Sequence, residues 1–564
     1  MRRPKKSVFL LILVSLLAFS YADERTVKVD ELFAAWDKPD SPGCSLAVVK
    51  DGQIVYKRSY GSANLELGVP ITPQSVFYVG SVSKQFTAFC IALLAKEGKL
   101  TLDDDVRKHI PEMPDYGNPI TIRHFIHHTS GIRDYLELEG IAGIDPGSYH
   151  EQDVLELLAR QKNLNFAPGE EYLYSNGGYF LLGVIVKRTS GRSLREFAAE
   201  KIFRPLGMKN TQFHDDYRRL IKDRASGYFP AGKDTFQNFL STFDCVGSGG
   251  LFSSVEDLFL WDQNFYDGRA GGKDLIDLMH TQGKLNSGRE LDYACALTIG
   301  TYKGLKTVSH GGALGGYRSM LLRFPDQRFS VIILSNLSSF NTTKLAQQIA
   351  DIYLAEFMKE KAEARPADQI KPFPVTTEKL KEKAGSYINR KTGDVGKILL
   401  SDGRLTMLTF GSKFPLFATT ETEFRPLEAP VEVIVRFEKQ AEGQPLLMHV
   451  TIEGRNPETY EAFHPVEPTL EKLKDYEGDY YSDELGVTFK LALKEGRLYF
   501  SHRNAPAGTL QPTLEDKFVL GNWNLSFKRG GEAKVACFVL NAGRVRNLQF
   551  TKKEKLVTPL PTLS

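Results

Sequence analysis

The sequence lacks several features that would assign it to a common class of protein. Its 564 residues include only five cysteines, which are dispersed and form no C-x-x-C pair. Such a set indicates neither a zinc centre nor a disulfide framework. Lysine and arginine total 72 against 69 aspartate and glutamate residues, a balance that argues against a nucleic-acid-binding or polybasic membrane protein.

Two catalytic signatures are missing as well. The sequence contains neither the G-x-S-x-G elbow of α/β-hydrolases nor the H-E-x-x-H pattern of zinc peptidases. His124, His127 and His128 do cluster, but they lack the spacing of a metal site, and we expect them to cap or pack a helix. We therefore predict no metal and no cofactor.

The N-terminus has the pattern of an export signal. Four basic residues among the first six precede an almost unbroken apolar run, Val8–Phe19, and the small residues Ser20 and Ala22. This predicts a signal peptide over residues 1–22 and a secreted or periplasmic chain that starts near Asp23 without a stable membrane anchor. The run is shorter than a spanning helix needs, and an uncleaved anchor is the alternative.

The rest of the chain is typical of a multidomain globular protein. With 42% hydrophobic and 25% charged residues it can bury a large core, and its length suggests two to four domains. Over residues 23–359, strand-like runs at both ends enclose a helical middle. The pair Asp51-Gly52 predicts a hairpin turn between two of these runs. We expect an α/β (α+β) domain with a mainly antiparallel sheet. Its strands are expected at Cys44–Lys50, Gln53–Tyr60, Leu297–Tyr302, Thr307–His310, Tyr317–Phe324 and Phe329–Ser335.

The C-terminal third contains an internal repeat. Residues 360–374 are rich in charge, alanine and proline, as in a linker. Three short matches follow at one common offset: Glu378–Lys381 with Glu471–Lys474, Gly385–Tyr387 with Gly478–Tyr480, and Gly403–Leu405 with Gly496–Leu498. Both copies are rich in β-branched and aromatic residues, which predicts two small antiparallel β-barrel repeats over 375–467 and 468–564. The polar linker predicts that the first domain folds without them.

The strongest chemical signal is a serine and a lysine that precede an apolar stretch. Phe86–Ala95 is nearly all apolar, which predicts a buried helix with Ser81 at its N-terminus and Lys84 one turn later. A helix N-terminus favours developing negative charge, and a neighbouring amine can accept a proton, so the pair suits a serine nucleophile. The alternative is that Ser81 only caps the helix and that Lys84 is solvated.

Two further segments carry polar residues at sites that suit a ligand. Tyr174 and Asn176 lie two apart in an irregular stretch, so both can face one cavity. His310 ends a strand-like run, and Gly311 and Gly312 leave room for a ligand backbone beside the strand edge. The alternatives are a loop tyrosine, a helix-capping asparagine and a plain strand end.

Together these segments resemble a known triplet of motifs. In sequence order they are S-x-x-K at Ser81–Lys84, Y-x-N at Tyr174–Asn176 and H-x-G at His310–Gly312. The triplet resembles that of serine β-lactamases and penicillin-binding proteins. His128–Gly131 and Gly249–Ser254 extend the likeness to the branch of class C β-lactamases, D,D-peptidases, D-aminopeptidases and esterases. The paired β-units resemble those of D-aminopeptidases by architecture alone.

The resemblance implies roles for the first two motifs. Ser81 would attack the substrate carbonyl and become acylated. Lys84 and Tyr174 would act together as general base and general acid, and the resemblance does not show which of them contributes more. Asn176 would position Lys84 and the substrate.

The third motif departs from that of the β-lactamases. His310 stands where those enzymes have a lysine, so a neutral imidazole offers one hydrogen bond in place of a fixed charge. Gly312 would lie beside the substrate. The resemblance further implies an oxyanion hole made by the backbone N–H groups of Ser81 and Ala313.

We expect an exported serine hydrolase that cleaves peptide, amide or ester bonds through an acyl-enzyme, with small D-amino-acid-containing peptides preferred. Within this class, the alternatives are a carboxylesterase and a weak β-lactamase. Outside it, the alternative is a non-catalytic cell-wall-peptide binder, although a binder needs no nucleophile and base. A further alternative gives the function to the C-terminal units, as carbohydrate or partner binders.

Overall fold

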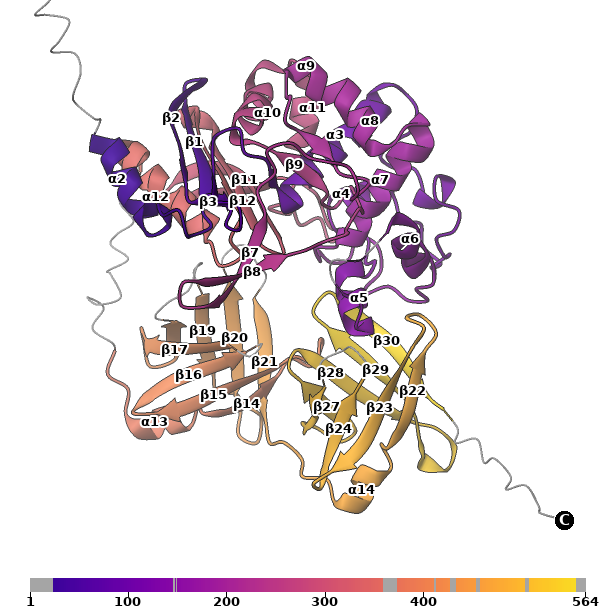
Figure 1. The fold of residues 1–564 in the computed structure, drawn as a ribbon. Coiled ribbons are helices and arrows are strands. Elements are labelled where there is room, and N and C mark those ends of the chain that lie inside the picture. Colours follow the sequence, from indigo (N-terminus) through magenta and orange to yellow (C-terminus); the bar gives the residue numbers. More distant parts are fainter. Residues whose placement is uncertain are drawn as a thin grey trace, which may run out of the picture.

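A computed structural model gives the fold as three units, which we call the first unit (24–358), the first barrel (373–463) and the second barrel (468–553) (Figure 1). The residues it describes are 24–145, 148, 150–358, 373–409, 412–426, 433–452, 457–502 and 507–553. The predicted signal peptide and most of the predicted linker lie outside them. Within the described ranges, no helix is long and apolar enough to cross a membrane.

The first unit is built on a six-stranded antiparallel sheet, as predicted. In spatial order its strands are β10 (Thr298–Tyr302), β11 (Leu305–Leu314), β12 (Tyr317–Phe324), β13 (Phe329–Ser335), β1 (Cys44–Lys50) and β2 (Gln53–Tyr60). Asp51 and Gly52, in the turn between β1 and β2, have φ values of 50° and 79°, as a two-residue type I′ turn requires. Strands from the two ends of this unit's sequence therefore pair directly, β1 with β13.

Helices cover both faces of the sheet, and alternate side chains divide between them. Leu46 and Val48 belong to one core, and Ala47 and Val49 to the core on the opposite face. The helices of the first core are α2 (Glu24–Phe33) and α12 (Thr342–Leu354), and those of the second include α3 (Ser83–Lys96), α7 (Asn176–Ser190) and α10 (Val255–Asp267). Beyond them lie α4 (Ile122–Ile126), α5 (Tyr135–Ala142), α6 (Glu151–Ala159), α8 (Leu194–Ala198) and α11 (Lys273–Met279).

One predicted strand is longer than expected. The glycines after His310 were expected to end it, but β11 continues to Leu314 because β12 pairs with it along that stretch. β10 pairs with β11 only as far as Ser309. One edge of β11 is therefore left open from His310 onward, beside the functional site.

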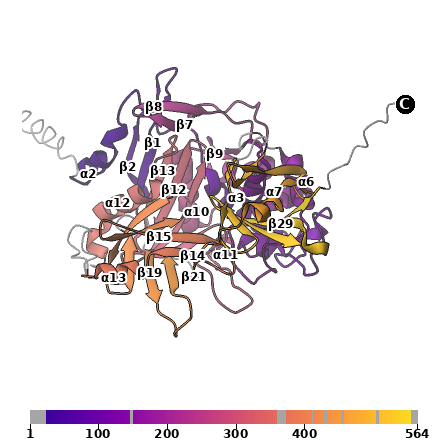
Figure 2. The ribbon, with the colours of Figure 1, turned by 90° about the horizontal axis from the view of Figure 1, so that it is seen from below.

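The C-terminal part forms the two predicted all-β units. In the first, a closed barrel follows α13 (Thr377–Lys381): β14 (Gly385–Ile388), β15 (Val395–Ser401), β16 (Arg404–Thr409), β17 (Ser412–Ala418), β18 (Glu423–Pro426), β19 (Val433–Glu438), β20 (Leu447–Ile452) and β21 (Glu458–Phe463). The second is a nearly closed sheet of nine strands after α14 (Leu470–Lys474): β22 (Gly478–Ser482), β23 (Val487–Lys494), β24 (Arg497–Ser501), β25 (Gly508–Thr509), β26 (Gln511–Pro512), β27 (Lys517–Leu520), β28 (Trp523–Arg529), β29 (Val535–Ala542) and β30 (Val545–Lys552). Seen from below, the two units lie side by side (Figure 2).

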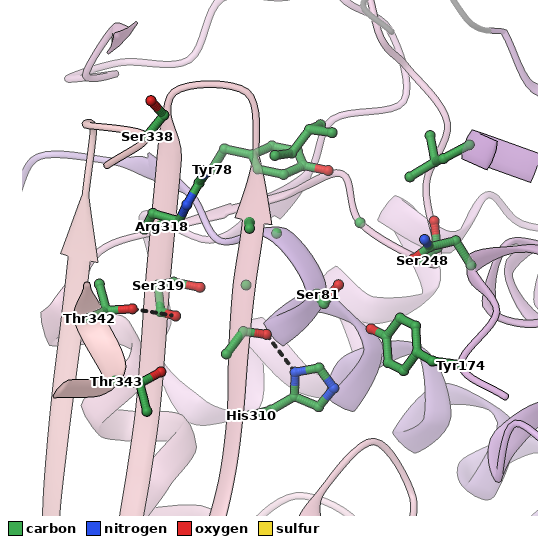
Figure 3. A pocket seen from close by; sticks show the side chains of 18 of the residues that line it. Tyr78, Ser81, Tyr174, Ser248, His310, Arg318, Ser319, Ser338, Thr342 and Thr343 are labelled. Carbon is green, nitrogen blue, oxygen red and sulfur yellow. Dashed lines mark hydrogen bonds between the residues drawn. The ribbon is translucent and has the colours of Figure 1, made fainter. Parts of the chain in front are cut away.

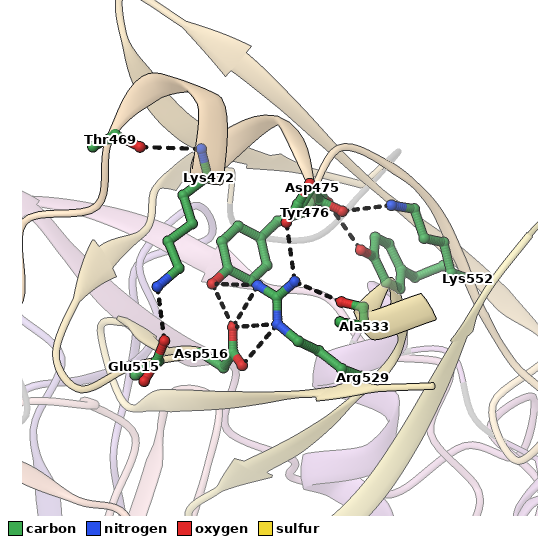
Figure 4. A network of polar contacts seen from close by, with 10 residues as sticks. Thr469, Lys472, Asp475, Tyr476, Glu515, Asp516, Arg529, Ala533 and Lys552 are labelled. Atoms are coloured by element: carbon green, nitrogen blue, oxygen red, sulfur yellow. Dashed lines mark hydrogen bonds and ion pairs between the residues drawn. The ribbon is translucent and has the colours of Figure 1, made fainter. Parts of the chain in front are cut away.

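The two barrels repeat the same polar contacts, and the lysines and tyrosines that donate them lie in the matched segments of the sequence repeat. Lys379 pairs with Glu421 in the first barrel, and Lys472 pairs with Glu515 in the second. The Tyr387 hydroxyl likewise donates to the carbonyl of Lys383, and the Tyr480 hydroxyl donates to the carbonyl of Tyr476. The second barrel adds a network in which Arg529 pairs with Asp475 and Asp516 (Figure 4). These contacts fix each short helix over the strands that follow it.

The second barrel packs against the first unit through buried charges. The Arg133 and Glu484 side chains are 0% and 3% exposed, and their Nη1 and Oε2 atoms lie 2.5 Å apart. Arg133 also donates to the backbone carbonyls of Arg546 and Asn547. In Figure 1, α5 of the first unit lies directly above β30. Because these charges would lose their partners in a truncated chain, we now expect the first unit to depend on the second barrel.

Candidate active site

Ser81 lies in the short 3-10 turn Gly80–Val82, immediately before α3. The predicted helix thus begins two residues later than expected, and the serine stands on the turn that leads into it. It lines a cavity of about 640 Å³ with Tyr174, Asn176 and His310. Figure 3 shows Ser81 from the turn before α3, Tyr174 from the loop before α7 and His310 from β11 around one space. The structure therefore brings together the three predicted motifs.

Lys84 is completely buried within reach of the serine. Its Nζ lies 3.0 Å from Ser81 Oγ, 2.8 Å from Asn176 Oδ1 and 2.6 Å from the carbonyl oxygen of Ser248. Burial lowers the pKa of Lys84 well below its usual value, because a charged amine loses its hydration there. A solvated lysine, the alternative considered above, does not fit this position.

Asn176 is held by a buried carboxylate. Its backbone N–H and its Nδ2 both donate to Asp134 Oδ2, over 2.6 and 2.9 Å. Because Nδ2 is committed to Asp134, the amide oxygen must face Lys84. Asn176 is the first residue of α7, so the carboxylate also accepts one of the helix's unpaired N–H groups.

Tyr174 completes the wall beside the nucleophile. Its hydroxyl points towards Ser81 in Figure 3, and its ring centroid lies 4.9 Å from Lys84 Nζ. Burial raises the pKa of Tyr174 above its usual value, and its hydrogen bond with Ser81 opposes the rise. The tyrosine is therefore a neutral phenol, which can pass a proton but carries no charge.

His310 does not offer the free hydrogen bond that the sequence suggested. Its Nδ1 donates to the carbonyl oxygen of Gly311 over 2.6 Å, so Nε2 is the acceptor of the Tyr293 hydroxyl at 3.0 Å. Burial, with Lys84 nearby, lowers the pKa of His310 to about 4. The imidazole is neutral at pH 7, and both ring nitrogens are engaged by the protein.

Two glycines allow β11 to approach the serine turn closely. A Cβ atom on Gly312 would lie 2.1 Å from the carbonyl oxygen of Val79 and 2.9 Å from the backbone N of Ser81. A Cβ atom on Gly80, which has a φ of 55°, would lie 2.6 Å from the backbone N of Ala313. The backbone N–H groups of Ser81 and Ala313 thus belong to two segments in tight contact.

Comparison with known proteins assigns this arrangement to a family. Residues 29–354 match the family model described as Beta-lactamase. The chain belongs to the β-lactamase family. It is a serine hydrolase of that family, as the motif triplet predicted.

Relatives in this β-lactamase family match between about two thirds and nine tenths of the chain. Penicillin-binding protein 4* of Bacillus subtilis (strain 168) is 31% identical over 408 residues, 69% of this chain and 89% of that protein. A D-aminopeptidase of Gluconobacter oxydans (strain 621H) is 27% identical over 515 residues, 88% of this chain and 93% of that protein. The structure of the octameric penicillin-binding protein homologue from Pyrococcus abyssi matches with a TM-score of 0.56 and 26% identity, over 77% of this chain and 99% of that one.

Four residues of this site were missed by sequence reasoning. They are Asp134, Tyr293, Arg544 and Ser248, which contributes its carbonyl oxygen. Asp134 follows the segment His128–Gly131, which was noted only as part of a family likeness. No motif marks Arg544, which comes from the far end of the chain.

Proposed function

We propose that the protein is a serine peptidase or amidase that cleaves D-amino-acid-containing peptides through an acyl-enzyme on Ser81. Two kinds of relative support this proposal by their names, a D-aminopeptidase and a penicillin-binding protein. The match to the D-aminopeptidase covers 88% of this chain, so it extends from the first unit into the C-terminal barrels.

The observation that carries the proposal is the set of contacts around Lys84. A neutral amine has two N–H donors and one lone pair, and two of its neighbours, Asn176 Oδ1 and the Ser248 carbonyl, can only accept. The lone pair is then directed at the third neighbour, the Ser81 hydroxyl, 3.0 Å away. Lys84 is thereby set to take the proton of Ser81 as a general base.

The acylation step follows from this arrangement. Ser81 Oγ forms a bond to the substrate carbonyl carbon as its proton passes to Lys84 Nζ. The carbon–nitrogen bond of the tetrahedral intermediate then breaks, and the leaving amine takes a proton through Lys84 and the Tyr174 hydroxyl. Water, deprotonated by the same groups, hydrolyses the ester and returns Ser81 to its starting state.

The backbone N–H groups of Ser81 and Ala313 would stabilise the oxyanion. Both lie where β11 meets the serine turn, and the open edge of β11 gives a substrate access to them. Preorganised donors of this kind stabilise the negative charge that develops on the carbonyl oxygen.

Two adjacent glycines give a matched test of that donor pair. Gly312→Ala is expected to lower Ser81 acylation by about 10²–10³-fold, the usual loss for one oxyanion donor, because its methyl group would push β11 away from the turn. At Gly311 an added Cβ would meet nothing closer than 3.4 Å, so Gly311→Ala serves as the control. The measurement is the rate of Ser81 labelling by a fluorophosphonate. Equal rates in the two variants would contradict the assignment of the donors.

The substrate class is tested by a panel with Ser81→Ala as the control for each member. It contains p-nitrophenyl acetate, D- and L-alanine p-nitroanilides, a D-Ala-D-Ala peptide and nitrocefin. We expect turnover of the ester and of the D-configured amides, with slow turnover of nitrocefin, because His310 supplies no fixed charge for a lactam carboxylate. Nitrocefin as the fastest substrate would instead indicate a β-lactamase, and activity on the ester alone an esterase. No turnover of any member of the panel would favour a binding protein.

A further inference from the structure

The turn between β29 and β30 carries a cation from the second barrel into the wall of the active-site cavity. This residue, Arg544, lines the cavity, and its Cζ lies 5.8 Å from the centroid of the Tyr174 ring. Its guanidinium contacts two carboxylates of the first unit, Asp134 at 3.2 Å and Glu137 at 3.3 Å. Its side chain is 29% exposed.

The backbone of this turn is docked as firmly as the side chain. The carbonyl oxygen of Arg544 accepts from Asn165 Nδ2 over 2.9 Å and from the backbone N–H of Asp134 over 3.4 Å. A Cβ atom on the preceding Gly543 would lie 2.6 Å from Glu137 Oε2, so the turn packs against the Glu137 side chain. Arg544 is therefore held at a fixed place beside Asp134.

A continuous line of contacts runs from this arginine to the nucleophile. Asp134 Oδ2, which Arg544 contacts, is the oxygen that accepts both N–H groups from Asn176. Asn176 Oδ1 then accepts from Lys84 Nζ, which in turn lies 3.0 Å from Ser81 Oγ. Asp134 is completely buried; N–H groups of Asn176, Leu136 and Glu137 donate to its carboxylate, and Arg544 is the cation that pairs with it.

We propose that Arg544 is a positioning residue for the hydrolase reaction, which holds Asp134 and, through Asn176, the Lys84 amine in line with Ser81. This inference rests on the proposed function. It makes the second barrel a part of the catalytic centre, although no barrel residue that the structure describes hydrogen-bonds to Ser81 or Lys84.

The charge of Arg544 also bears on the protonation of Lys84. Asp134 raises the pKa of Lys84 and Arg544 lowers it, on top of the dominant effect of burial. The other titratable groups that face the amine are uncharged at pH 7. They are His128, His310, Tyr174 and Tyr179. Burial lowers the pKa of the two histidines and raises the pKa of the two tyrosines. Loss of the arginine would leave the carboxylate unopposed, which favours the protonated amine and removes the general base at a given pH.

The test is the pH profile of Ser81 labelling by a fluorophosphonate in the full chain. Arg544→Gln is expected to slow labelling at pH 7 by about 10²-fold, the cost of a misplaced catalytic group, and to move the acidic limb of the profile to higher pH. Arg544→Lys keeps the charge but loses the two-pronged contact, so it should slow labelling with a smaller shift of the limb. The matched control is Arg546→Gln, on the same strand hairpin, which loses a contact to Glu171 outside the cavity.

Each outcome decides between the two proposals. An unlabelled Ser81 in the parent protein would overturn the proposed function, and the inference with it. If Ser81 is labelled in the parent and Arg544→Gln has the same pH profile, the inference alone is overturned. The same holds if Arg544→Gln and Arg546→Gln lose the same labelling rate and neither shifts the acidic limb. If Arg544→Gln unfolds, Arg544→Lys carries the test, and parental labelling in that variant overturns the inference.

Discussion

Replacement of Lys84 by alanine is expected to lower the turnover of an amide substrate by about 10²–10⁴-fold, the usual contribution of a general acid–base group. The reason is geometric, because the amine has its two donors committed to Asn176 and Ser248 and its lone pair directed at Ser81. Tyr174→Phe, which removes only the phenolic oxygen beside Ser81, is expected to cost a factor in the same range. Steady-state kcat and kcat/KM measure both effects.

The double variant distinguishes one proton relay from two independent groups. If Lys84 and Tyr174 move one proton together, the double variant should lose much less than the product of the single losses. Multiplicative losses would contradict this and assign the two groups to separate steps. The controls are Lys96→Ala, at the exposed end of the same helix, and Tyr172→Phe, two residues from Tyr174 on the same loop. Neither side chain lines the cavity, and both variants should retain parental turnover.

The sheet and the nucleophile could be predicted because their signals are local. The Asp51-Gly52 pair predicted the β1–β2 hairpin, and the apolar run after Lys84 predicted a buried helix, since both patterns reflect the chemistry of a few neighbouring residues. The predicted end of β11 was wrong because the true end depends on contacts with distant segments. Glycines that would weaken an isolated strand are tolerated there because β12 supplies pairing and the serine turn needs close approach.

The groups that support the motif residues could not be predicted, because their contacts join distant parts of the chain. Asp134 is one aspartate among many until folding places it against the N-terminus of α7. Arg544 belongs to a repeat unit whose sequence indicates only a barrel, and its position in the cavity follows from how the second barrel packs on α5. The sequence located His310 in the site. It could not show that Nε2 of this histidine is already engaged, because that contact comes from Tyr293.

Removal of the Arg133 side chain is expected to lower the free energy of unfolding by about 3–5 kcal/mol, the usual cost of leaving one partner of a buried ion pair unpaired. Arg133→Leu would leave Glu484 buried with its charge and would also free the carbonyl groups of Arg546 and Asn547. Urea unfolding measures this loss of stability, and we expect both the first unit and the second barrel to be destabilised.

The control for this variant lies beside it on the same interface. Lys162 pairs with Asp483, but the two side chains are 62% and 65% exposed, so Lys162→Ala should leave the unfolding curve unchanged. Chains that stop at residue 467 lose Glu484 and Arg544 together, and we expect them to be unstable and to lose Ser81 labelling. A stable, fully labelled chain of that length would show that the interface is dispensable. Stability in Arg133→Leu equal to that of Lys162→Ala would contradict the expectation that the buried pair stabilises the interface between the two units.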